Sequence, residues 1–330
     1  MSNSETFIPV RVHRSQFPAE VRSALLSSLE QRAINHKVHY ATYHQAEQWR
    51  SLFVRYSPFF NDPLCRKIYA QSYEGSLTFL SGSKVHVMGL GCGSGEKDVA
   101  LLHVVRRAGK DASYTPMDVS VPLVLAAYEK TRAAGIEVSP GIVCDLIAAG
   151  DDLAGSDSTP RLVTFFGMLP NFEPALALVA LSRILRAGDL LLLSANLVAS
   201  DSEAAMRSVL PQYNNAPTVG WLLTFLTDLG VKADDGTVMW AVETDAESAQ
   251  RADTTGGKLR RLTAWFEFTR ARSVRVEGRE LSFAAGERVR LFFSYRYTVE
   301  QLTAVLEKYG LRVEGSWATG DEGVVLCRKG

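Results

Sequence analysis

The chain has 330 residues, more than a single hydrophobic core usually holds, so we expect two domains or lobes. Hydrophobic residues make up 46% and charged residues 22%, close to globular averages, which argues against a disordered or fibrous chain. The 36 Lys and Arg residues balance the 36 Asp and Glu residues. This zero net charge argues against a nucleic-acid partner or a membrane-bound basic anchor.

The spacing of the cysteines and the N-terminal residues indicate the cellular compartment in which we expect the protein. The four cysteines form no C-x-x-C pair and fit reduced thiols better than a disulfide or zinc framework (Cys65, Cys92, Cys144 and Cys327). Residues 1–6 are polar and unlike a signal peptide. No apolar run approaches the roughly 18 residues that a membrane span needs. We therefore expect a cytoplasmic protein.

The first half of the chain begins with a helical pattern and then alternates strands with helices. Apolar spacing predicts a helix over residues 18–34, and the aromatic-rich segment 35–61 should pack against the rest or line a pocket. The predicted strands are 85–90, one ending at 118, 138–144, 162–166 and 189–193, and the predicted helices are 96–107, 121–134 and 175–185. Such alternation predicts a doubly wound, mostly parallel sheet.

Residues 200–289 interrupt this alternation. The interruption contains predicted helices at 204–210 and 221–229 and β-like runs at 237–243 and 263–276. After it come a strand at 289–297, a helix at 299–309 with a Thr298-x-x-Gln301 capping box, and a hairpin from 311–317 and 324–327. This order is typical of class I S-adenosylmethionine-dependent methyltransferases, an α/β class with a Rossmann-like seven-stranded sheet.

The glycine cluster of residues 89–95 lies between a predicted strand and helix. Glycines such as Gly91 and Gly93 let the backbone approach a ligand and present N–H groups at a helix N-terminus. Dinucleotide and S-adenosylmethionine sites share this pattern, and a tight turn without a ligand is the plain alternative.

Two acidic residues at strand ends favour a nucleoside cofactor. Asp118 ends the second strand and suits a ribose diol of either NAD or S-adenosylmethionine, unless it only caps the next helix. Asp145 and the apolar Leu146 follow the third strand, where methyltransferases hydrogen-bond the adenine amino group and pack its ring. NAD enzymes have no general need for such a residue. Asp145 therefore favours S-adenosylmethionine, although a turn Asp is the alternative.

The segment Leu90–Lys97, Leu-Gly-Cys-Gly-Ser-Gly-Glu-Lys, resembles the Leu-Gly-Ser-Gly-x-Ser-Glu-Lys loop of the histidine-specific N-α-methyltransferase family. That family includes enzymes acting on histidine and on dimethylallyltryptophan. The resemblance runs from about residue 38 to the C-terminus and includes Pro116–Val119, Phe166–Asn171, Leu185–Leu192, Phe283–Glu287 and Ser294. It implies a methyltransferase domain of residues 62–199 and 290–330. A discontinuous α+β substrate-binding lobe would then comprise residues 1–61 and 200–289.

The resemblance also implies roles for individual residues. Lys97 would contact the methionine carboxylate of the cofactor, and Asn171 the amino and carboxylate groups of the substrate. Tyr56 matches the tyrosine that holds the substrate carboxylate, Tyr40 and Tyr213 match pocket tyrosines, and Ser294 matches the serine beside the histidine ring. We expect Tyr40, Tyr56 and Asn171 to be catalytic. A solvated lysine, a turn asparagine and core tyrosines are the structural alternatives.

Three departures from the family pattern affect the interpretation. Phe292 stands where histidine methyltransferases carry the Glu that binds imidazole, and Ala264 stands where they carry a Met before Trp265. Both changes imply a larger, more apolar substrate pocket. Gly89 replaces an acidic residue common at this strand end, so the loop could meet the cofactor differently.

The sequence thus predicts an S-adenosylmethionine-dependent N-methyltransferase that acts on the α-amino group of an aromatic or bulky amino acid, or an amine derived from one. One alternative is a methyltransferase of a secondary-metabolite pathway acting on another small nucleophile. Others are an inactive cofactor-binding protein and, with less support, a nicotinamide dehydrogenase. His36, His39 and His44, with Asp62 nearby, fit no common zinc spacing, so we expect no metal. The sequence does not specify an oligomeric state.

Overall fold

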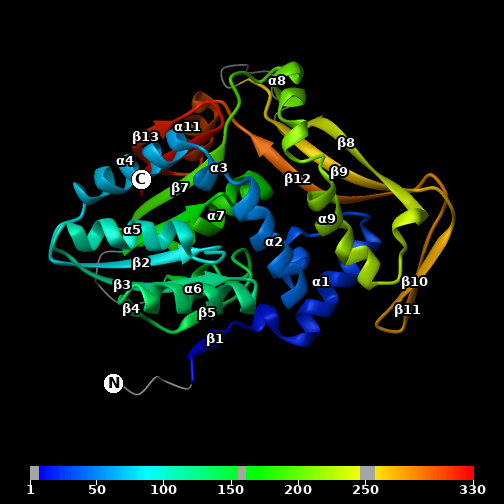
Figure 1. Cartoon of the computed structure of the whole chain (residues 1–330), viewed down its shortest axis with the longest axis horizontal. Coiled ribbons are helices and arrows are strands. Elements are labelled where there is room, and N and C mark those ends of the chain that lie inside the picture. The colour runs from blue at the N-terminus through cyan, green and yellow to red at the C-terminus, as the bar shows by residue number, and fades with distance from the viewer. Residues whose placement is uncertain (1–6, 155–160, 246–256) are drawn as a thin grey trace.

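The computed structural model describes residues 7–154, 161–245 and 257–330, so the polar N-terminal residues 1–6 lie outside the described residues. The described part contains a central sheet of nine strands, a three-stranded sheet and a two-stranded hairpin. In Figure 1 the central sheet and its helices lie on the left, and the smaller sheets lie on the right. Helices α1 (Pro18–Glu30) and α2 (Tyr43–Tyr56) lie between the two parts.

The central sheet has mostly parallel strands. Its order is β1 (Val10–Val12), β5 (Gly141–Val143), β3 (Asp111–Asp118), β2 (Lys84–Leu90), β6 (Arg161–Phe166), β7 (Leu190–Asn196), β14 (Glu322–Lys329) and β13 (Leu311–Ala318), with β4 (Glu137–Val138) also paired to β3. The pairs from β1 to β7 are parallel, and the terminal hairpin adds antiparallel to β7. The predicted α/β class is confirmed, and β1 and β4 extend the expected seven strands.

Helices cover both faces of this sheet because its buried strands are apolar on both sides. One face carries α4 (Pro63–Leu77), α5 (Glu96–Arg107) and α6 (Val121–Ala133), and the other carries α7 (Pro174–Ile184) and α11 (Val299–Lys308). Alternation along β7 separates the two cores. Leu190 and Leu192 join the first core, whereas Leu191 and Leu193 join the second. The predicted Thr298–Gln301 capping box begins α11.

The second part of the molecule has its own apolar core. It contains the antiparallel strands β8 (Gly236–Thr244), β9 (Arg260–Phe268) and β12 (Arg288–Arg296), the hairpin β10 (Arg272–Val276) and β11 (Arg279–Phe283), and helices α8 (Glu203–Ser208) and α9 (Ala216–Asp228). The short helix α3 (Pro58–Asn61) instead packs against α4, and its Phe59 contacts the core of the central sheet. Residues of α1, α9, β9 and β12 share one buried cluster. This packing holds β12 and α9 in place beside the central sheet.

Several predicted element boundaries differ from the structure. The run 263–276 divides into β9 and β10, which belong to different sheets, and the strand 138–144 divides into β4 and β5. The three-residue β1 is too short for a periodic signal, and it pairs with β5 in the central sheet. The strand β12 pairs with β9. The two-domain division remains a prediction, but β1 and β12 do not follow its expected boundaries at residues 61 and 290.

Candidate active site

Two adjoining cavities lie where the carboxyl ends of the central strands face the second part of the molecule. The first cavity has a volume of about 490 Å³ and lies beside β3, the segment 144–147 and the 3-10 helix η2 (His36–Tyr40). The second has a volume of about 280 Å³ and lies among α2, α9, β12 and the glycine loop. Residues lining both cavities are Tyr40, Trp49, Gly91, Gly93, Met168 and Asn171. Ligands bound in the two cavities would therefore lie next to each other.

The glycine loop after β2 has room for backbone but not for side chains. Gly91 and Gly93 have φ angles of +62° and +54°, in the left-handed region that favours glycine. A Cβ on Gly91 would lie 2.7 Å from Met168 Cγ, and one on Gly93 would lie 2.6 Å from Trp49 Cη2. The chain therefore needs glycine at both positions, as expected for a loop that approaches a ligand.

Asp118 lies at the end of β3 and lines the first cavity. The backbone N–H groups of Gly93 and Ser120 each donate a 3.0 Å hydrogen bond, one to each carboxylate oxygen. Burial raises the pKa of Asp118 to about 6, although these hydrogen bonds oppose the shift. The carboxylate lines the cavity and can accept further hydrogen bonds there, so it suits a ribose hydroxyl group.

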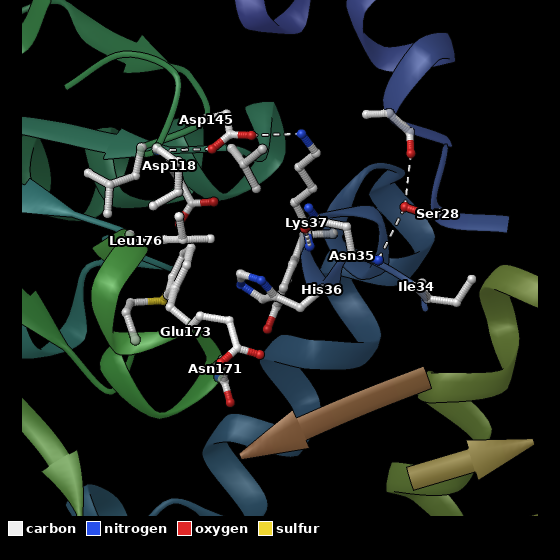
Figure 2. A pocket seen from close by; sticks show the side chains of 18 of the residues that line it. Ser28, Ile34, Asn35, His36, Lys37, Asp118, Asp145, Asn171, Glu173 and Leu176 are labelled. Carbon is white, nitrogen blue, oxygen red and sulfur yellow. Dashed lines mark hydrogen bonds and ion pairs between the residues drawn. The ribbon is translucent and has the colours of Figure 1, made fainter. Parts of the chain in front are cut away.

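Asp145 and Leu146 line the same cavity at the end of β5. Lys37 Nζ lies 2.7 Å from Asp145 Oδ2, and the two side chains meet across the cavity in Figure 2. The N–H of Ile147 donates to the other carboxylate oxygen at 3.0 Å. An acceptor beside the apolar Leu146 suits the edge and face of an adenine ring. Lys37 was not predicted, and an adenine amino group would share Asp145 with it.

Lys97 lines the second cavity on the first turn of α5. Its Nζ donates to the Tyr69 hydroxyl at 2.6 Å and lies 3.5 Å from Glu322 Oε1. The ammonium also lies within 6 Å of the ring centres of Phe53, Phe59, Tyr69 and Phe166. Lys97 thus lines the second cavity, whereas Asp118 lines the first, and its contact with a cofactor carboxylate stays a prediction.

These residues together fit S-adenosylmethionine. Asp118 presents acceptors for a ribose, Asp145 and Leu146 present an acceptor and an apolar surface for adenine, and Lys97 presents a cation for the amino-acid end. The backbone at Gly91 and Gly93 borders both cavities, and a Cβ at either position would contact Met168 or Trp49. Glycine therefore lets the loop backbone lie close to a bound cofactor, which supports the same fit.

Asn171 and Tyr40 lie at the junction of the cavities. Asn171 ends the 3-10 helix η4 (Leu169–Asn171), and its side-chain amide has no hydrogen bond to another described residue. Burial, and secondarily the charge of Asp118, raises the pKa of Tyr40 above its usual range. Tyr40 therefore stays protonated and offers a neutral hydroxyl.

A polar cluster lies deeper in the second cavity. Tyr213 OH is 3.3 Å from Ser294 Oγ and accepts hydrogen bonds from Asn196 Nδ2 at 3.3 Å and Arg296 Nη2 at 2.9 Å. The ring of Phe292 packs 5.9 Å from that of Tyr213. Side chains from three separate elements thus meet beside the aromatic wall.

The structure brings nearly all predicted site residues to these cavities. Tyr56 lines the second cavity with 40% of its surface exposed. Ala264 is the exception, because it is fully buried and opposes Phe292 across the β9–β12 pair without lining either cavity. Its assignment as a substrate-contacting residue does not agree with this position; Ala264 packs behind the pocket wall.

Other lining residues were missed in the sequence. Trp49 and Met168 border both cavities, and Asn196 and Arg296 border the second. Two of them carried a usable signal. Asn196 ends β7, where site residues of parallel sheets gather, and Arg296 follows Ser294 by two residues on the same strand face.

The side chains of His36 and His39 contact other protein groups rather than a common metal position. Burial, followed by the charge of His39, lowers the pKa of His36 to about 4, and its ring points into the first cavity (Figure 2). His39 Nε2 lies 2.8 Å from the carbonyl oxygen of Leu291, and burial lowers its pKa to about 4. Both rings are therefore neutral at pH 7. Within the described ranges, no three His, Cys, Asp or Glu side chains are grouped to hold a metal.

The four cysteines are free thiols, and among the described helices none has the length and apolarity to cross a membrane. Burial raises the pKa of Cys65, Cys144 and Cys327 to about 12. These three thiols are therefore protonated and serve as packing groups.

Comparisons with known proteins point to the same cofactor as the residues of the site. Residues 68–329 match the family described as histidine-specific methyltransferase, SAM-dependent. A histidine N-alpha-methyltransferase from Mycolicibacterium smegmatis is 30% identical over 250 residues, covering 72% of this chain and 73% of that protein.

Solved structures similar to the chain are also methyltransferases. The 1,6-didemethyltoxoflavin-N1-methyltransferase of Burkholderia thailandensis has a TM-score of 0.42 and 12% identity, covering 97% of this chain and 93% of that one. A SAM-dependent methyltransferase of Methanosarcina mazei has a TM-score of 0.39 and 14% identity, with coverage of 77% and 96%. Likenesses this distant carry no information about the substrate.

Proposed function

The chain belongs to the family of histidine-specific, S-adenosylmethionine-dependent methyltransferases, and on this basis we propose that it methylates the α-amino group of an aromatic or bulky amino acid. Methyltransferase activity and the cofactor follow from the family. The choice of an amino acid with a large apolar side chain is the proposal, and it rests on the second cavity.

The position of Asn171 supports the α-amino group of an amino acid as the methyl acceptor. Asn171 borders the cavity that fits adenosine and also the cavity that contains the polar cluster. Its amide presents both an acceptor and a donor, and neither is used by another described side chain. A free amino acid offers matching groups, since its amine donates and its carboxylate accepts. Asn171 can therefore orient the amine of an acceptor toward the cofactor cavity.

The wall around Phe292 supports a large apolar side chain. Phe292 lines the second cavity together with Trp221, Leu222 and Tyr213. An imidazole needs polar partners that can satisfy both ring nitrogens, and Phe292 supplies none. Ser294 remains as one polar group on this wall. The surface therefore favours an aromatic or bulky side chain over free histidine.

Bound S-adenosylmethionine supplies an electrophilic methyl group, so that an S–C bond breaks as an N–C bond forms. The residues of the chain must hold the acceptor amine unprotonated and aligned, since an ammonium has no lone pair. The Asn171 oxygen can accept one N–H of the amine, and the neutral Tyr40 hydroxyl can accept another. After transfer the product is a secondary ammonium, and it returns to the neutral amine by losing one of its two protons to solvent.

The test is mass spectrometry of reactions containing S-adenosylmethionine and single amino acids, including tryptophan, tyrosine and histidine. We expect one or more methyl groups to be added to an aromatic member, with less on histidine. Binding of S-adenosylhomocysteine, measured by calorimetry, serves as the control for a folded protein. Methylation of histidine alone would contradict the proposed preference. Product binding without methylation of any amino acid would contradict the proposed acceptor class.

A further inference from the structure

Arg296 is a buried cation that faces the second cavity. It lies on β12 two residues after Ser294, with 4% of its surface exposed. A guanidinium keeps its charge at neutral pH. Burying a charge is costly unless an opposite charge or a complete set of hydrogen bonds compensates it. The partners of Arg296 therefore indicate whether its charge is compensated within the protein.

The partners of Arg296 are all neutral. Its Nη2 donates to Gln212 Oε1 at 3.1 Å and to Tyr213 OH at 2.9 Å, and its Nη1 donates to the Leu197 carbonyl at 3.4 Å. Its Nε has no hydrogen-bond partner. In the described part of the chain, no carboxylate forms an ion pair with Arg296.

Another buried arginine shows what full compensation looks like in this fold. Arg161 has 6% of its surface exposed, and its Nη2 and Nε lie 2.6 and 3.0 Å from Asp189 Oδ2. Its other donors reach the carbonyl oxygens of Leu153 and Ile184. Arg161 is thus paired and fully bonded, whereas Arg296 is neither. Arg296 lines a cavity, where a ligand can supply the missing negative charge.

The polar side chains beside Arg296 also have hydrogen-bond donors for which the cluster supplies too few acceptors. Tyr213 OH receives hydrogen bonds from Arg296 and from Asn196 Nδ2, so its own hydrogen is available to Ser294 or to a ligand. Asn196 Nδ2 also approaches Ser294 Oγ at 3.4 Å. Donors therefore outnumber acceptors in this cluster, and a carboxylate brings both the acceptors and the negative charge.

We infer that Arg296, with Tyr213 and Asn196, binds a carboxylate of the methyl acceptor. The inference rests on the proposed function and narrows it, because an amine formed by decarboxylation of an amino acid lacks this group. The enzyme therefore selects intact amino acids over the corresponding amines. A purely structural Arg296, which only ties β12 to Gln212 and Tyr213, would give no such selection.

The experiment compares matched acceptors and matched variants. The acceptor pairs are tryptophan with tryptamine, tyrosine with tyramine, and histidine with histamine, each assayed for methylation by mass spectrometry. The variants are Arg296→Met, which removes the charge, Arg296→Lys, which retains it, and Arg275→Met, an exposed control on β10. Calorimetry of S-adenosylhomocysteine binding verifies that each variant is folded.

The wild-type enzyme should prefer the amino acid of a methylated pair. Arg296→Met should lower kcat/KM for that amino acid on the order of 100-fold, since it removes one partner of a desolvated charge pair. Its kcat/KM for the amine should hardly change, so the preference disappears, while Arg296→Lys recovers part of it. An amine methylated as efficiently as its amino acid, or a preference retained in Arg296→Met, overturns the inference.

A second measurement does not depend on methyl transfer. Carbon-13 acetate is titrated into the S-adenosylhomocysteine complex and followed by NMR. Acetate should bind to the wild type and to Arg275→Met, and binding should be lost in Arg296→Met. No acetate binding, or equal binding by wild type and Arg296→Met, overturns the inference. If acetate binding requires Arg296 but no amino acid is methylated, the proposed function fails and the anion site stands.

Discussion

The carboxylate of Asp98 fills the space into which a side chain at Gly89 would project. A Cβ on Gly89 would lie 2.5 Å from Asp98 Oδ2 and 2.6 Å from the Tyr114 hydroxyl. Tyr114 and Thr164 each donate a 2.6 Å hydrogen bond to Asp98, so its side chain cannot move away freely. Burial raises the pKa of Asp98 to about 6. The acidic group beside this strand end therefore comes from α5, and glycine makes room for it.

This relationship predicts that Gly89→Ala destabilises the fold. Forcing one methyl group against Asp98 and Tyr114 should cost about 1–3 kcal/mol, as for other overpacked sites. The cost should be smaller when Asp98→Ala is already present, because that change opens the space. A double-mutant cycle by chemical denaturation measures the coupling. Strictly additive costs would mean that the two positions do not compete for space.

Cofactor binding should weaken in acid through Asp118. Its pKa of about 6 lies above the usual 3.8, so the carboxylate becomes protonated as the pH falls through 6. A protonated Asp118 offers fewer acceptors to ribose hydroxyls, whereas binding favours the ionised form. The affinity for S-adenosylhomocysteine, measured by calorimetry from pH 8 to pH 5, should therefore drop below about pH 6.

The matched variant is Asp118→Asn, which keeps the shape and cannot titrate. It should bind S-adenosylhomocysteine more weakly at pH 8 and lose most of the drop below pH 6. Asp98 has a pKa near the same value, so a drop that persists unchanged in Asp118→Asn would assign the effect elsewhere.

Replacing Asn171 should affect methyl transfer more than cofactor binding. Asn171→Ala removes the amide that orients the acceptor at the junction of the cavities, and we expect kcat/KM to fall about 100-fold or more. Affinity for S-adenosylhomocysteine should change little. Asn171→Asp retains one acceptor and should keep more activity than Asn171→Ala. Equal activity of Asn171→Ala and wild type would remove Asn171 from the reaction.

The identity of residue 292 should set the choice of side chain. Phe292→Glu places a carboxylate on the wall beside Ser294, so the kcat/KM ratio for histidine over tryptophan should rise by about tenfold or more. Phe292→Leu preserves an apolar wall and should not favour histidine. Steady-state kinetics with both amino acids measure the ratio. A ratio equal to that of wild type in Phe292→Glu would refute the assignment of this position.

Much of the fold followed from local patterns. The glycine loop between β2 and α5, the capping box of α11 and the terminal hairpin all have short-range signals, and the structure contains each of them. Strand boundaries were harder to predict where one continuous run of β-forming residues forms strands of two different sheets, as in β9 and β10. Helix α9 begins at Ala216, earlier than its apolar spacing suggested, because Asn215 accepts a hydrogen bond from the Thr218 N–H and caps it.

The candidate site was predictable to the extent that its residues end strands or lie in the glycine loop. Asp118, Asp145 and the loop glycines are such residues, because the carboxyl ends of parallel strands share one edge of the sheet. Ala264 shows the limit of residue-by-residue assignment, since its neighbour across the strand pair, Phe292, faces the cavity while Ala264 is covered.

The amino-acid order alone was sufficient for the α/β class, the cofactor loop and the strand-end carboxylates, because these depend on neighbours within a few residues. Tertiary packing decided the partners across the site. Lys37 meets Asp145 over a separation of 108 positions, and Asn196 meets Ser294 over 98. Local propensity holds no information about such contacts. Only the docking of β12 and α9 beside the central sheet leaves Arg296 buried at a cavity wall without an opposite charge among the described residues.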